Sequence, residues 1–355
     1  MRKSAFELDF PTYETGLQSG IESSEHAAAL SVRVSAIIVT YNTGPYLWEC
    51  LQAVRNDPSI GQVIVVNNGN PDDQESRLRA LVREQAKFEL LDGHGNIGFA
   101  KACNMGAQAA HGRYLLFLNP DAVLENGAVN SMIAAGENRT GIWLAGGMLL
   151  DVFGKEQRGA RRGKLTLWNA AASFTGLSTV LAKIGGPSFR DVHWENTPLP
   201  AAAEVVPTVS GALMLMPAAQ FRQIGGFDEA YFLHVEDIDL CRRIGEEGGE
   251  VVFTPGACAK HYGSTSSANR VWVEWQKARG LDIYFRKFAG NPLEEAMAIL
   301  FSPIVRAALT LRAVYLSVRL NRRSANMKRL RALASERRVC NLPVGDAEAP
   351  KRTLA

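Results

Sequence analysis

Three stretches of the chain carry side chains that could take part in group transfer from a diphosphate. Asp121 ends the turn Asn119-Pro120-Asp121, which directly follows an apolar run. Carboxylates and diphosphate oxygens are ligands that Mg²⁺ and Mn²⁺ favour, so Asp121 could hold a divalent metal against a diphosphate. Taken alone, Asp121 is equally compatible with a cap on the next helix.

The second stretch is the acidic run Glu236-Asp237-Ile238-Asp239, which follows an aromatic segment. A carboxylate here could be the general base that deprotonates an acceptor hydroxyl. Acids are also common in the first turn of a helix, where the dipole and free N–H groups stabilise them, so the run alone does not establish a base. The third is His261. A single histidine is most often structural, and His261 becomes a candidate metal ligand only if Asp121 binds a metal.

Secondary structure has to position these residues, and the first half of the chain alternates strand and helix patterns. Short β-branched runs predict strands, and apolar residues three or four apart predict helices. The strands are expected at residues 34–40, 62–66, 88–91 and 114–118, and the helices at 45–56, 72–85 and 97–110. This order predicts a mostly parallel α/β sheet with helices on both faces, whose ligands bind beyond the carboxyl ends of the strands.

The carboxyl ends of the predicted strands bring polar stretches to one edge of the sheet: Tyr41-Asn42, Asn67-Asn68, residues 93–96 and Asn119–Asp121. The loop at 93–98 has glycines at 93, 95 and 98 and lacks the lysine of a P-loop, so it is either a phosphate-binding loop or a simple helix cap. Later strands are expected at 209–216 and 251–253, with a helix at 236–247. Residues 151–200 have weak signals and are interpreted as a variable connection.

Composition narrows the functional classes. The formal net charge of the 355 residues is only +3, so nothing global indicates a nucleic-acid partner. The five cysteines form no CxxC pair, which argues against a zinc site and fits a reducing compartment. The N-terminal segment has no apolar run of the kind found in secretory signals. These features are typical of a cytoplasmic globular protein.

Taken together, the motifs resemble those of the family 2 glycosyltransferases of the GT-A fold, in the branch that contains rhamnosyltransferases. The matching segments occur in the family's order over roughly residues 33 to 266: residues 37–42, 63–68, 95–104, 118–121, 210–212, 226–229, 236–243 and 261–264. Each segment is a weak signal alone, and eight in order are a strong one. The resemblance implies a Rossmann-like, mostly parallel sheet and direct displacement with inversion at the anomeric carbon of a nucleotide-sugar.

The resemblance also implies a role for each matching position. The nucleotide-sugar donor is expected to contact Thr40, Tyr41, Asn42, Asn67, Asn68, Asn96, Gly98, Phe99, Lys101, Asn104, Asn119 and Asp121. The sugar and acceptor site is expected to be shaped by Gly211, Ala212, Phe227 and Asp228. Asp237, with Glu236 beside it, matches the acidic pair that holds the catalytic base. Asp121 and His261 match the positions that bind Mg²⁺ or Mn²⁺.

Two positions depart from the family pattern. Asn119 stands where many members have the first aspartate of a D-x-D motif, which removes one negative charge from the metal site. Asn67 stands where many members have an aspartate, and it replaces an acceptor-only group with one that also donates hydrogen bonds. An Asn-Pro-Asp turn is frequent in rhamnosyltransferase-like members, so the resemblance favours dTDP-rhamnose as the donor and a glycan or lipid-linked glycan as the acceptor in cell-surface polysaccharide synthesis.

The domain organisation expected from these patterns has four parts. Residues 1–32 are an N-terminal extension, 33–270 the GT-A domain, 271–340 a C-terminal helical region and 341–355 a polar tail. The longest apolar run of the helical region, residues 296–305, is shorter than a membrane-spanning helix needs. Between Arg306 and Arg338 there are ten Lys or Arg residues and one acid, so residues 293–338 are expected to lie on a membrane surface, at the inner face of the cell membrane, or to pack on the body or on a second subunit.

Two other functions remain open from the sequence. A sugar nucleotidyltransferase also uses a parallel sheet and a diphosphate, but it would want a basic residue after the first strand. The sequence there is Tyr41-Asn42-Thr43-Gly44, without Lys or Arg. A non-catalytic carbohydrate-binding protein on the same fold would have no need for both Asp121 and Asp237. A homo-oligomer also remains open.

Overall fold

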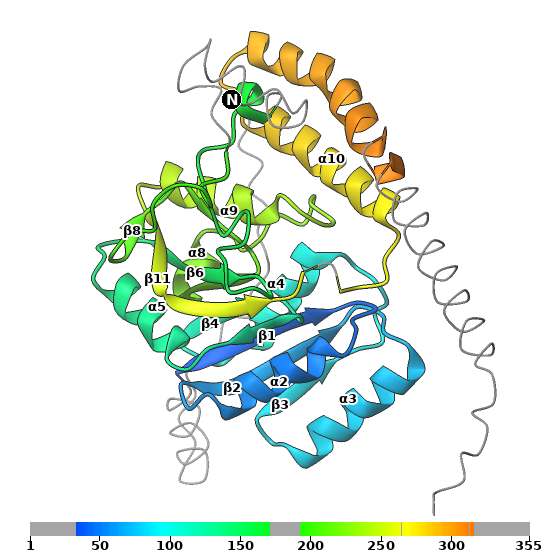
Figure 1. Cartoon of the computed structure of the whole chain (residues 1–355), viewed down its shortest axis with the longest axis vertical. Coiled ribbons are helices and arrows are strands. Elements are labelled where there is room, and N and C mark those ends of the chain that lie inside the picture. Colours follow the sequence, from blue (N-terminus) through cyan, green and yellow to red (C-terminus); the bar gives the residue numbers. More distant parts are fainter. Residues whose placement is uncertain (1–32, 171–191, 264, 312, 316–355) are drawn as a thin grey trace, which may run out of the picture.

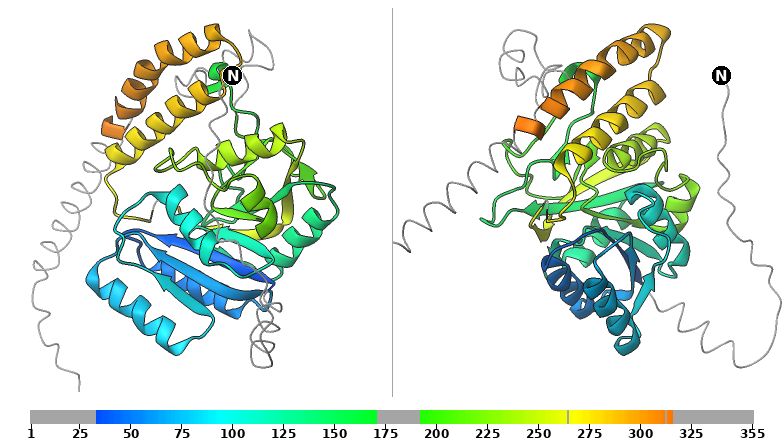
Figure 2. Two further views of the ribbon diagram at one scale, coloured as in Figure 1. Left: turned by 180° about the vertical axis from the view of Figure 1, so that it is seen from behind. Right: turned by 90° about the vertical axis from the view of Figure 1, so that its right-hand side faces the viewer.

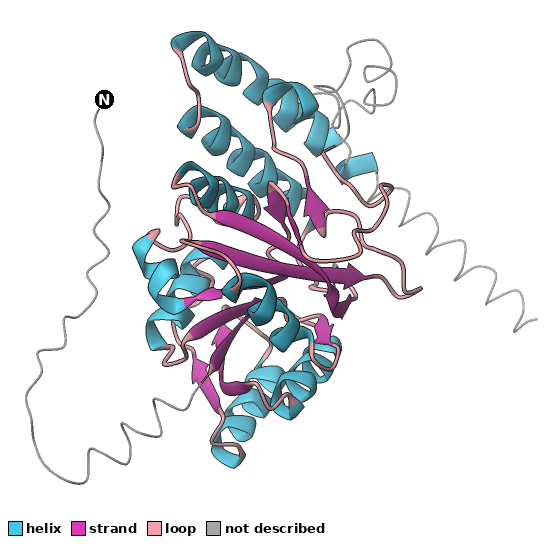
Figure 3. Cartoon of the chain, turned by 90° about the vertical axis from the view of Figure 1, so that its left-hand side faces the viewer, coloured by secondary structure: helices cyan, strands magenta, loops and turns pink. Residues whose placement is uncertain are grey.

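The computed structural model describes residues 33–170, 192–263, 265–311 and 313–315. Its centre is a nine-stranded sheet in which strands follow the order β3-β2-β1-β4-β10-β6-β11-β5, with β8 paired to β11. Helices pack on both sides of this sheet (Figure 3). The expected α/β sheet with helices on both faces is therefore confirmed.

The first half of the sheet is the parallel half. Strands β1 (Val34–Thr40), β2 (Ile60–Asn67), β3 (Phe88–Leu91) and β4 (Tyr114–Leu118) are joined by helices α2 (Tyr46–Asn56), α3 (Asp72–Glu84) and α4 (Phe99–Ala109). All residues of β1 and β4 are buried, which explains why both read as uninterrupted apolar runs. Because β1 pairs in parallel with β2 and β4, the ends of these three strands lie along one edge (Figure 1).

The second half of the sheet is mixed. Strand β10 (Leu213–Pro217) is antiparallel to both β4 and β6 (Trp143–Leu150), whereas β11 (Glu250–His261) runs parallel to β6. Strand β11 then pairs antiparallel with β5 (Ala122–Leu124) and with β8 (Glu204–Val205). The remaining elements are α5 (Ala128–Glu137), β7 (Arg161–Arg162), β9 (Thr208–Val209), α8 (Ala218–Gln223) and α9 (Glu236–Glu246).

The sequence patterns missed part of this second half. The strand expected at 209–216 is divided into β9 and β10, and the interruption carries Ser210-Gly211-Ala212. The strand expected at 251–253 continues to His261 through a shift in register between Thr254 and Cys258. This extension matters for function, because it carries β11 as far as β5.

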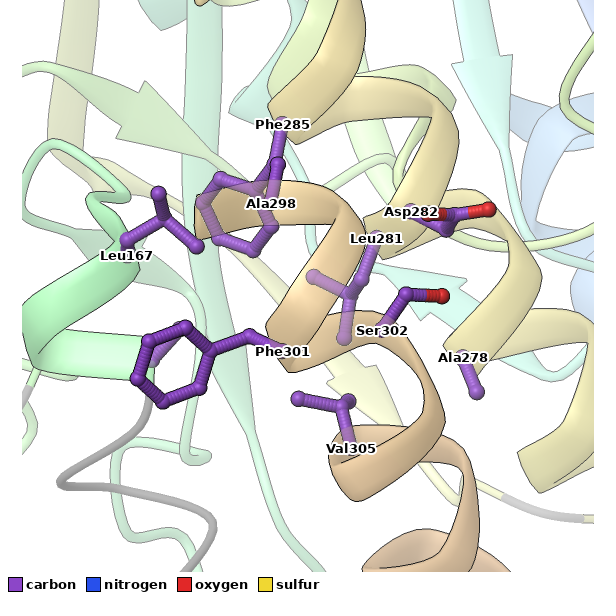
Figure 4. A pocket seen from close by; sticks show the side chains of 10 residues that line it. Leu167, Ala278, Leu281, Asp282, Phe285, Ala298, Phe301, Ser302 and Val305 are labelled. Atoms are coloured by element: carbon purple, nitrogen blue, oxygen red, sulfur yellow. The ribbon is translucent and has the colours of Figure 1, made fainter. Parts of the chain in front are cut away.

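Two helices form a hairpin at one end of the molecule. Helix α10 (Arg270–Lys287) is followed by an apolar helix, Pro292–Tyr315, and the two lie side by side in every view (Figures 1 and 2). A small apolar core joins them to α9 and to residues 165–170, with Tyr284, Leu281 and Leu309 buried in it. Figure 4 shows Phe301 of the apolar helix facing Leu167, with Leu281 and Phe285 of α10 next to it.

The apolar helix is longer than its sequence suggested. It has 24 residues, and by length and composition it could cross a membrane, which residues 296–305 alone could not. The apolar run at 296–305 is therefore only part of this helix, which continues past Arg306 to Tyr315. What the helix does in the folded chain depends on its packing, which is considered below.

Candidate active site

A cavity of about 880 Å³ opens at the carboxyl ends of the parallel strands. Its wall brings together most of the residues that the sequence singled out. They are Tyr41, Asn68, Asn96, Gly98, Phe99, Asn119, Asp121, Gly211, Ala212, Glu236, Asp237 and His261. Residues separated by more than 200 positions in the chain therefore meet in one cavity.

The sheet itself places His261 beside Asp121. Strand β11 ends where His261 pairs with Ala122 of β5, and the Tyr262 N–H donates to the Asp121 carbonyl. As a result the His261 Nε2 atom lies 3.2 Å from Asp121 Oδ1 and 3.3 Å from Asn119 Nδ2. Antiparallel pairing of two short strand ends thus assembles this part of the site.

The hydrogen bonds around Asp121 and His261 suit a cation. The His261 Nδ1 atom is held by Gln157 Oε1, which leaves Nε2 directed at Asp121. Metal-binding histidines are typically fixed in this way through their other ring nitrogen. A carboxylate oxygen and an imidazole nitrogen at 3.2 Å need a proton or a cation between them. Within the described residues no group of three or more His, Cys, Asp and Glu side chains could hold a metal ion.

The charge on Asp121 is stabilised in place. Burial opposes ionisation of this carboxyl, but hydrogen bonds from His261 and Thr265 more than offset it and hold the Asp121 pKa below its ordinary value. The Thr265 hydroxyl donates to Asp121 Oδ2 at 2.9 Å. Asp121 is therefore ionised, and its Oδ1 atom faces His261.

The Asp237 carboxylate lies in the same cavity at the start of α9. Its Oδ2 atom accepts hydrogen bonds from Arg162 and from the Gly211 N–H at 3.0 Å, and its Oδ1 atom accepts from the Ile238 N–H at 2.8 Å. Burial raises the energy of the charged form, but the Arg162 charge and the Gly211 N–H outweigh it, so the Asp237 pKa lies below its ordinary value. Gly211 contributes through its backbone, which no sequence pattern specifies.

Glu236 differs from its neighbour. Burial, together with the adjacent Asp237 charge, raises the Glu236 pKa from 4.5 to about 8, so this side chain is neutral at pH 7. Its Oε2 atom is buried and has no hydrogen-bond partner among the described residues. The two neighbouring acids therefore have different protonation states, a pattern often found where one carboxyl accepts a proton and the other donates a hydrogen bond.

The third acid of the run, Asp239, faces away from the cavity. It is fully buried and binds Arg243 Nε at 2.6 Å, Lys287 Nζ at 2.7 Å and the Tyr231 hydroxyl at 3.0 Å. Because Lys287 belongs to α10, this network ties α9 to the helical hairpin. Asp239 thus holds the helix whose first turn carries Glu236 and Asp237.

The backbone before α9 is strained. His234 and Val235 have positive φ angles of 67° and 77°, and such angles are rare for a β-branched residue such as valine. This conformation turns the chain sharply before Glu236. Burial and the Lys277 charge also lower the His234 pKa to about 4, so its imidazole is neutral in the cavity wall. Strain of this kind is concentrated at functional sites in proteins.

On the side of β1 and β2, asparagines shape the loops around the cavity. The Asn68 Nδ2 atom donates to the Gly98 carbonyl at 3.0 Å, and Asn96 Oδ1 accepts from the Gly98 N–H at 3.1 Å. Asn67 Oδ1 accepts from Gly69, Asn70 and the Asn70 side chain, so it holds the turn after β2. The side chains of Asn67, Asn68 and Asn96, which were expected to bind the donor, therefore hold the loops around the cavity through these hydrogen bonds.

Seven expected site residues do not line the cavity: Thr40, Asn42, Asn67, Lys101, Asn104, Phe227 and Asp228. Asn104 is buried and binds the Phe227 N–H and carbonyl at 2.9 and 2.8 Å, which fixes the turn before Asp228. Phe227 packs on Phe117 in the core, and Asp228 binds Lys287 of α10 at 2.6 Å. Lys101 is exposed on α4. The geometry gives Asn104, Phe227 and Asp228 supporting positions behind the site.

The sequence analysis missed three side chains that contact the predicted residues: Arg162, Gln157 and Thr265. Arg162 and Gln157 lie in the segment 151–200, where the signals were weak. The place of Arg162 follows from the short pairing of β7 with β9, and that of Gln157 from its N–H, which donates to the Leu149 carbonyl; neither leaves a periodic pattern. Thr265 lies just beyond the His261 motif, in the same loop.

Sequence families match two parts of the chain. The glycosyl transferase family 2 profile matches residues 35–184, and a profile described as the N-terminal domain of galactosyltransferase matches residues 203–265. The first match contains the turn that carries Asp121. The second contains Gly211, Asp237 and His261, so the two matches between them contain the residues that the sequence singled out.

Curated relatives and solved structures agree. An N-acetylglucosaminyl-diphospho-decaprenol L-rhamnosyltransferase of Mycobacterium tuberculosis is 25% identical over 65% of this chain and 76% of its own length. The rhamnosyltransferase WbbL of Escherichia coli is 24% identical over 64% of this chain and 83% of its own.

A crystal structure of GalNAc-T7 with UDP, GalNAc and Mn²⁺ superposes with a TM-score of 0.52 over 75% of this chain, at 13% identity, which shows a shared fold. The superposed region is about half of that protein's chain, 51%. Together with the motifs that meet in the cavity, these similarities identify the chain as a glycosyltransferase with the GT-A fold, similar in sequence to family 2 and to the rhamnosyltransferases.

Proposed function

We propose that this glycosyltransferase transfers L-rhamnose from dTDP-rhamnose to a lipid-linked glycan during synthesis of a cell-surface polysaccharide. The observation that carries the proposal is the single cavity in which Asp121, His261 and Asp237 meet. The relatives support the sugar and the acceptor, since one is a rhamnosyltransferase whose name specifies a diphospho-decaprenol acceptor. The reaction would take place in the cytoplasm, at the inner face of the cell membrane.

Asp237 is the proposed base. It takes the proton of the acceptor hydroxyl while that oxygen bonds to the anomeric carbon, and the bond from this carbon to the diphosphate breaks with inversion. Each carboxylate oxygen has about two lone-pair positions, and both positions on Oδ2 are used by Arg162 and Gly211. Oδ1 accepts only from Ile238, so Oδ1 is the atom left to receive the proton.

A divalent cation fits beside Asp121. Asp121 and His261 would bind Mg²⁺ or Mn²⁺, and the donor's diphosphate would complete the shell, since Mg²⁺ commonly takes one or two protein carboxylates together with substrate phosphates. When bound, the cation would stabilise the negative charge of the leaving diphosphate. Asn119 contributes an amide in place of a second carboxylate, so the protein supplies less charge to the cation than a D-x-D motif does.

Neutral Glu236 is proposed to donate a hydrogen bond to the bound substrate. Glu236 lines the cavity, its buried Oε2 atom has no hydrogen-bond partner among the described residues, and a protonated carboxyl can donate where a carboxylate cannot. The two acids would then have different roles, Asp237 as the base and Glu236 as a substrate-binding group.

The test of the proposed function is transfer by the Asp237→Asn variant. With dTDP-rhamnose and N-acetylglucosaminyl-diphospho-polyprenol, the wild type is expected to form a rhamnosylated lipid and release dTDP. In Asp237→Asn the rate should fall by about a hundredfold to ten-thousandfold, the range typical for loss of a general base, while dTDP-rhamnose still binds.

Glu246→Gln is the matched control on the same helix. Glu246 is exposed and forms a surface ion pair with Arg242, so its variant should transfer at the wild-type rate. Full activity of Asp237→Asn would exclude Asp237 as the base. Release of pyrophosphate from dTTP and a sugar phosphate would show nucleotidyl transfer in place of rhamnosyl transfer.

A further inference from the structure

The apolar helix Pro292–Tyr315 presents an apolar face to solvent. One side of the helix is buried on α10, with Ala298, Leu309 and Ala313 between 1% and 3% exposed. Of its described residues after Glu295, every exposed one is apolar. The largest are Ile299, Leu300, Ile304, Leu311, Val314 and Tyr315, with Leu300 and Leu311 exposed by 68% and 69%. We call these six residues the outer face. A contiguous exposed apolar surface of this kind marks an interaction site.

Ion pairs and packing decide whether this helix can span a bilayer or lie in its interface. Arg306 binds Asp282 of α10 at 2.8 Å, and the buried side of the apolar helix closes the small core around Leu281. Spanning a membrane would separate the helix from α10 and carry Arg306 into hydrocarbon without its partner, which is costly. Helix α10 is itself rich in Lys, Arg, Asp and Glu and cannot enter the hydrocarbon with the apolar helix. A position in the membrane interface keeps every one of these contacts and still buries the outer face.

The charge of the sequence beyond the helix favours an anionic surface. Residues 316–338 contain eight Lys or Arg residues and one acid, Glu336. Basic segments next to an apolar interfacial helix are attracted to anionic lipids, at about 1 kcal/mol for each Lys or Arg near the surface. Nearer the helix, Trp168 is half exposed in the segment that packs Leu167 beside Phe301 (Figure 4), and exposed tryptophans favour the membrane interface.

The catalytic cavity reaches this same hairpin. Besides the carboxylates and the charged α10 residues Arg270, Glu274 and Lys277, its wall includes five apolar residues: Leu165, Ala170, Val192, Leu281 and Ala313. Four of these residues belong to the small core around α10, and Ala313 belongs to the apolar helix. The side of the cavity next to the hairpin is therefore suited to an apolar portion of a substrate.

We propose that the outer face is a membrane-binding surface that lies in the interface of an anionic phospholipid bilayer. Docked in this way, the hairpin brings the apolar part of the cavity to the membrane, where the lipid end of the acceptor is held. The part of the inference that concerns the acceptor rests on the proposed function, whereas the binding to lipid is independent of it.

The experiment is flotation of the full chain with vesicles of phosphatidylcholine alone and of phosphatidylcholine with phosphatidylglycerol. The wild type is expected to float with the anionic vesicles and to bind less in high salt, because screening weakens the attraction of the basic segment. The double variant Leu300→Asp, Leu311→Asp should lower the vesicle-bound fraction about tenfold or more, since it removes two of the largest apolar side chains from the outer face.

The matched control is Leu199→Asp, because Leu199 is also exposed but lies in the loop before β8 and does not belong to the outer face. This control should float like the wild type. Binding of dTDP-rhamnose in solution should be equal in all three proteins, which would show that the double variant is folded. Because this assay contains no lipid, a failure of the donor proposal can be distinguished from a failure of the membrane proposal. Absence of vesicle binding by the wild type would overturn the inference. So would a wild-type dimer that the double variant converts to a monomer without any change in vesicle binding, since a second copy would then cover the outer face.

Discussion

At the scale of single residues, the protonation states of the site depend on Arg162. This side chain approaches Asp237 from β7 and also donates to the Val209 carbonyl at 2.9 Å. Two other titratable groups near Asp237 are Glu236 and His234; burial raises the pKa of Glu236 to about 8 and lowers that of His234 to about 4, so neither favours the charged form. Arg162 is therefore the positive charge that keeps the proposed base ionised.

Removal of this charge should move the acid limb of the pH profile. In Arg162→Gln, the buried Asp237 carboxylate loses its ion pair, and an uncompensated buried charge costs about 3–5 kcal/mol unless it takes up a proton. We expect Asp237 to protonate, so kcat/KM at pH 6 falls and recovers as the pH rises. Arg162→Lys should keep most of the activity at pH 6. Identical pH profiles for the wild type and Arg162→Gln would show that Arg162 does not set the charge of the base.

The raised pKa of Glu236 predicts how the stability of the folded chain depends on pH. Its pKa is raised in the folded chain to about 8, so the folded state binds more protons than the unfolded state between the ordinary value of 4.5 and about 8. Stability from this group is therefore full below pH 4.5 and is lost as the pH rises towards 8. Because glutamine does not titrate, Glu236→Gln lacks this loss of stability at high pH. The melting temperature of the variant minus that of the wild type should therefore be larger at pH 8 than at pH 5. An equal difference at the two pH values would contradict a neutral, buried Glu236.

Residue types and order were enough to predict several of the polar residues that line one cavity. Asp121, Asp237 and His261 were identified from sequence because each follows a recognisable strand or opens a helix. Arg162 and Gln157 were not, because they act through two-residue pairings and loops that leave no periodic pattern. The backbone N–H of Gly211 could not be identified either, since its contribution does not depend on a side chain.

At the scale of elements, the approach of the loop 93–98 to the segment before α9 depends on Gly98. This residue has a φ of 88°, and a Cβ atom there would lie 2.8 Å from the Phe232 carbonyl oxygen. The Phe99 N–H donates to that same oxygen at 2.7 Å, so α4 begins in contact with the segment that leads to Glu236 and Asp237. The donor side and the base side of the cavity are joined at this point.

Gly98→Ala should therefore harm both stability and donor binding. We expect a loss of about 1–3 kcal/mol in the free energy of unfolding, from the strained backbone and the clash together. The measurements are urea denaturation and titration with dTDP-rhamnose. Gly95→Ala is the matched control in the same loop, because its φ is also positive at 66° but its Cβ would meet nothing within 4 Å. If both variants behaved alike, backbone strain alone, and not contact with Phe232, would be the cause.

Secondary structure was predictable where local patterns decide it. Strands β1, β3 and β4 were located to the residue because each is a short, mostly apolar run, and β1 and β4 are fully buried. Strand β6 and helix α5 were not predicted, since β6 contains Gly146 and Gly147 and pairs only with distant strands. The length of β11 was underestimated because Pro255 and Gly256 interrupt its pattern, although pairing with β6 resumes at Cys258.

At the scale of the whole molecule, the catalytic cavity lies between the sheet and the helical hairpin. The parallel strands supply Asp121, α9 supplies Asp237, and Lys287 of α10 binds Asp239 on the far side of α9. The chain therefore couples its catalytic helix to the hairpin that carries the outer face. The family resemblance predicted the sheet but not this connection, which depends on contacts between parts of the chain far apart in sequence.

The central claim is that this cavity binds dTDP-rhamnose through Asp121. The most direct test is a thermal-shift panel of the wild type, Asp121→Ala and Asp237→Asn, each with dTDP-rhamnose or a UDP-sugar and with Mg²⁺ or Mn²⁺. A ligand that binds only the folded state must raise the melting temperature. We expect dTDP-rhamnose with metal to raise the midpoint of the wild type and of Asp237→Asn, and to leave Asp121→Ala unchanged. A shift with UDP-sugars and none with dTDP-rhamnose, or an undiminished shift in Asp121→Ala, would contradict the claim.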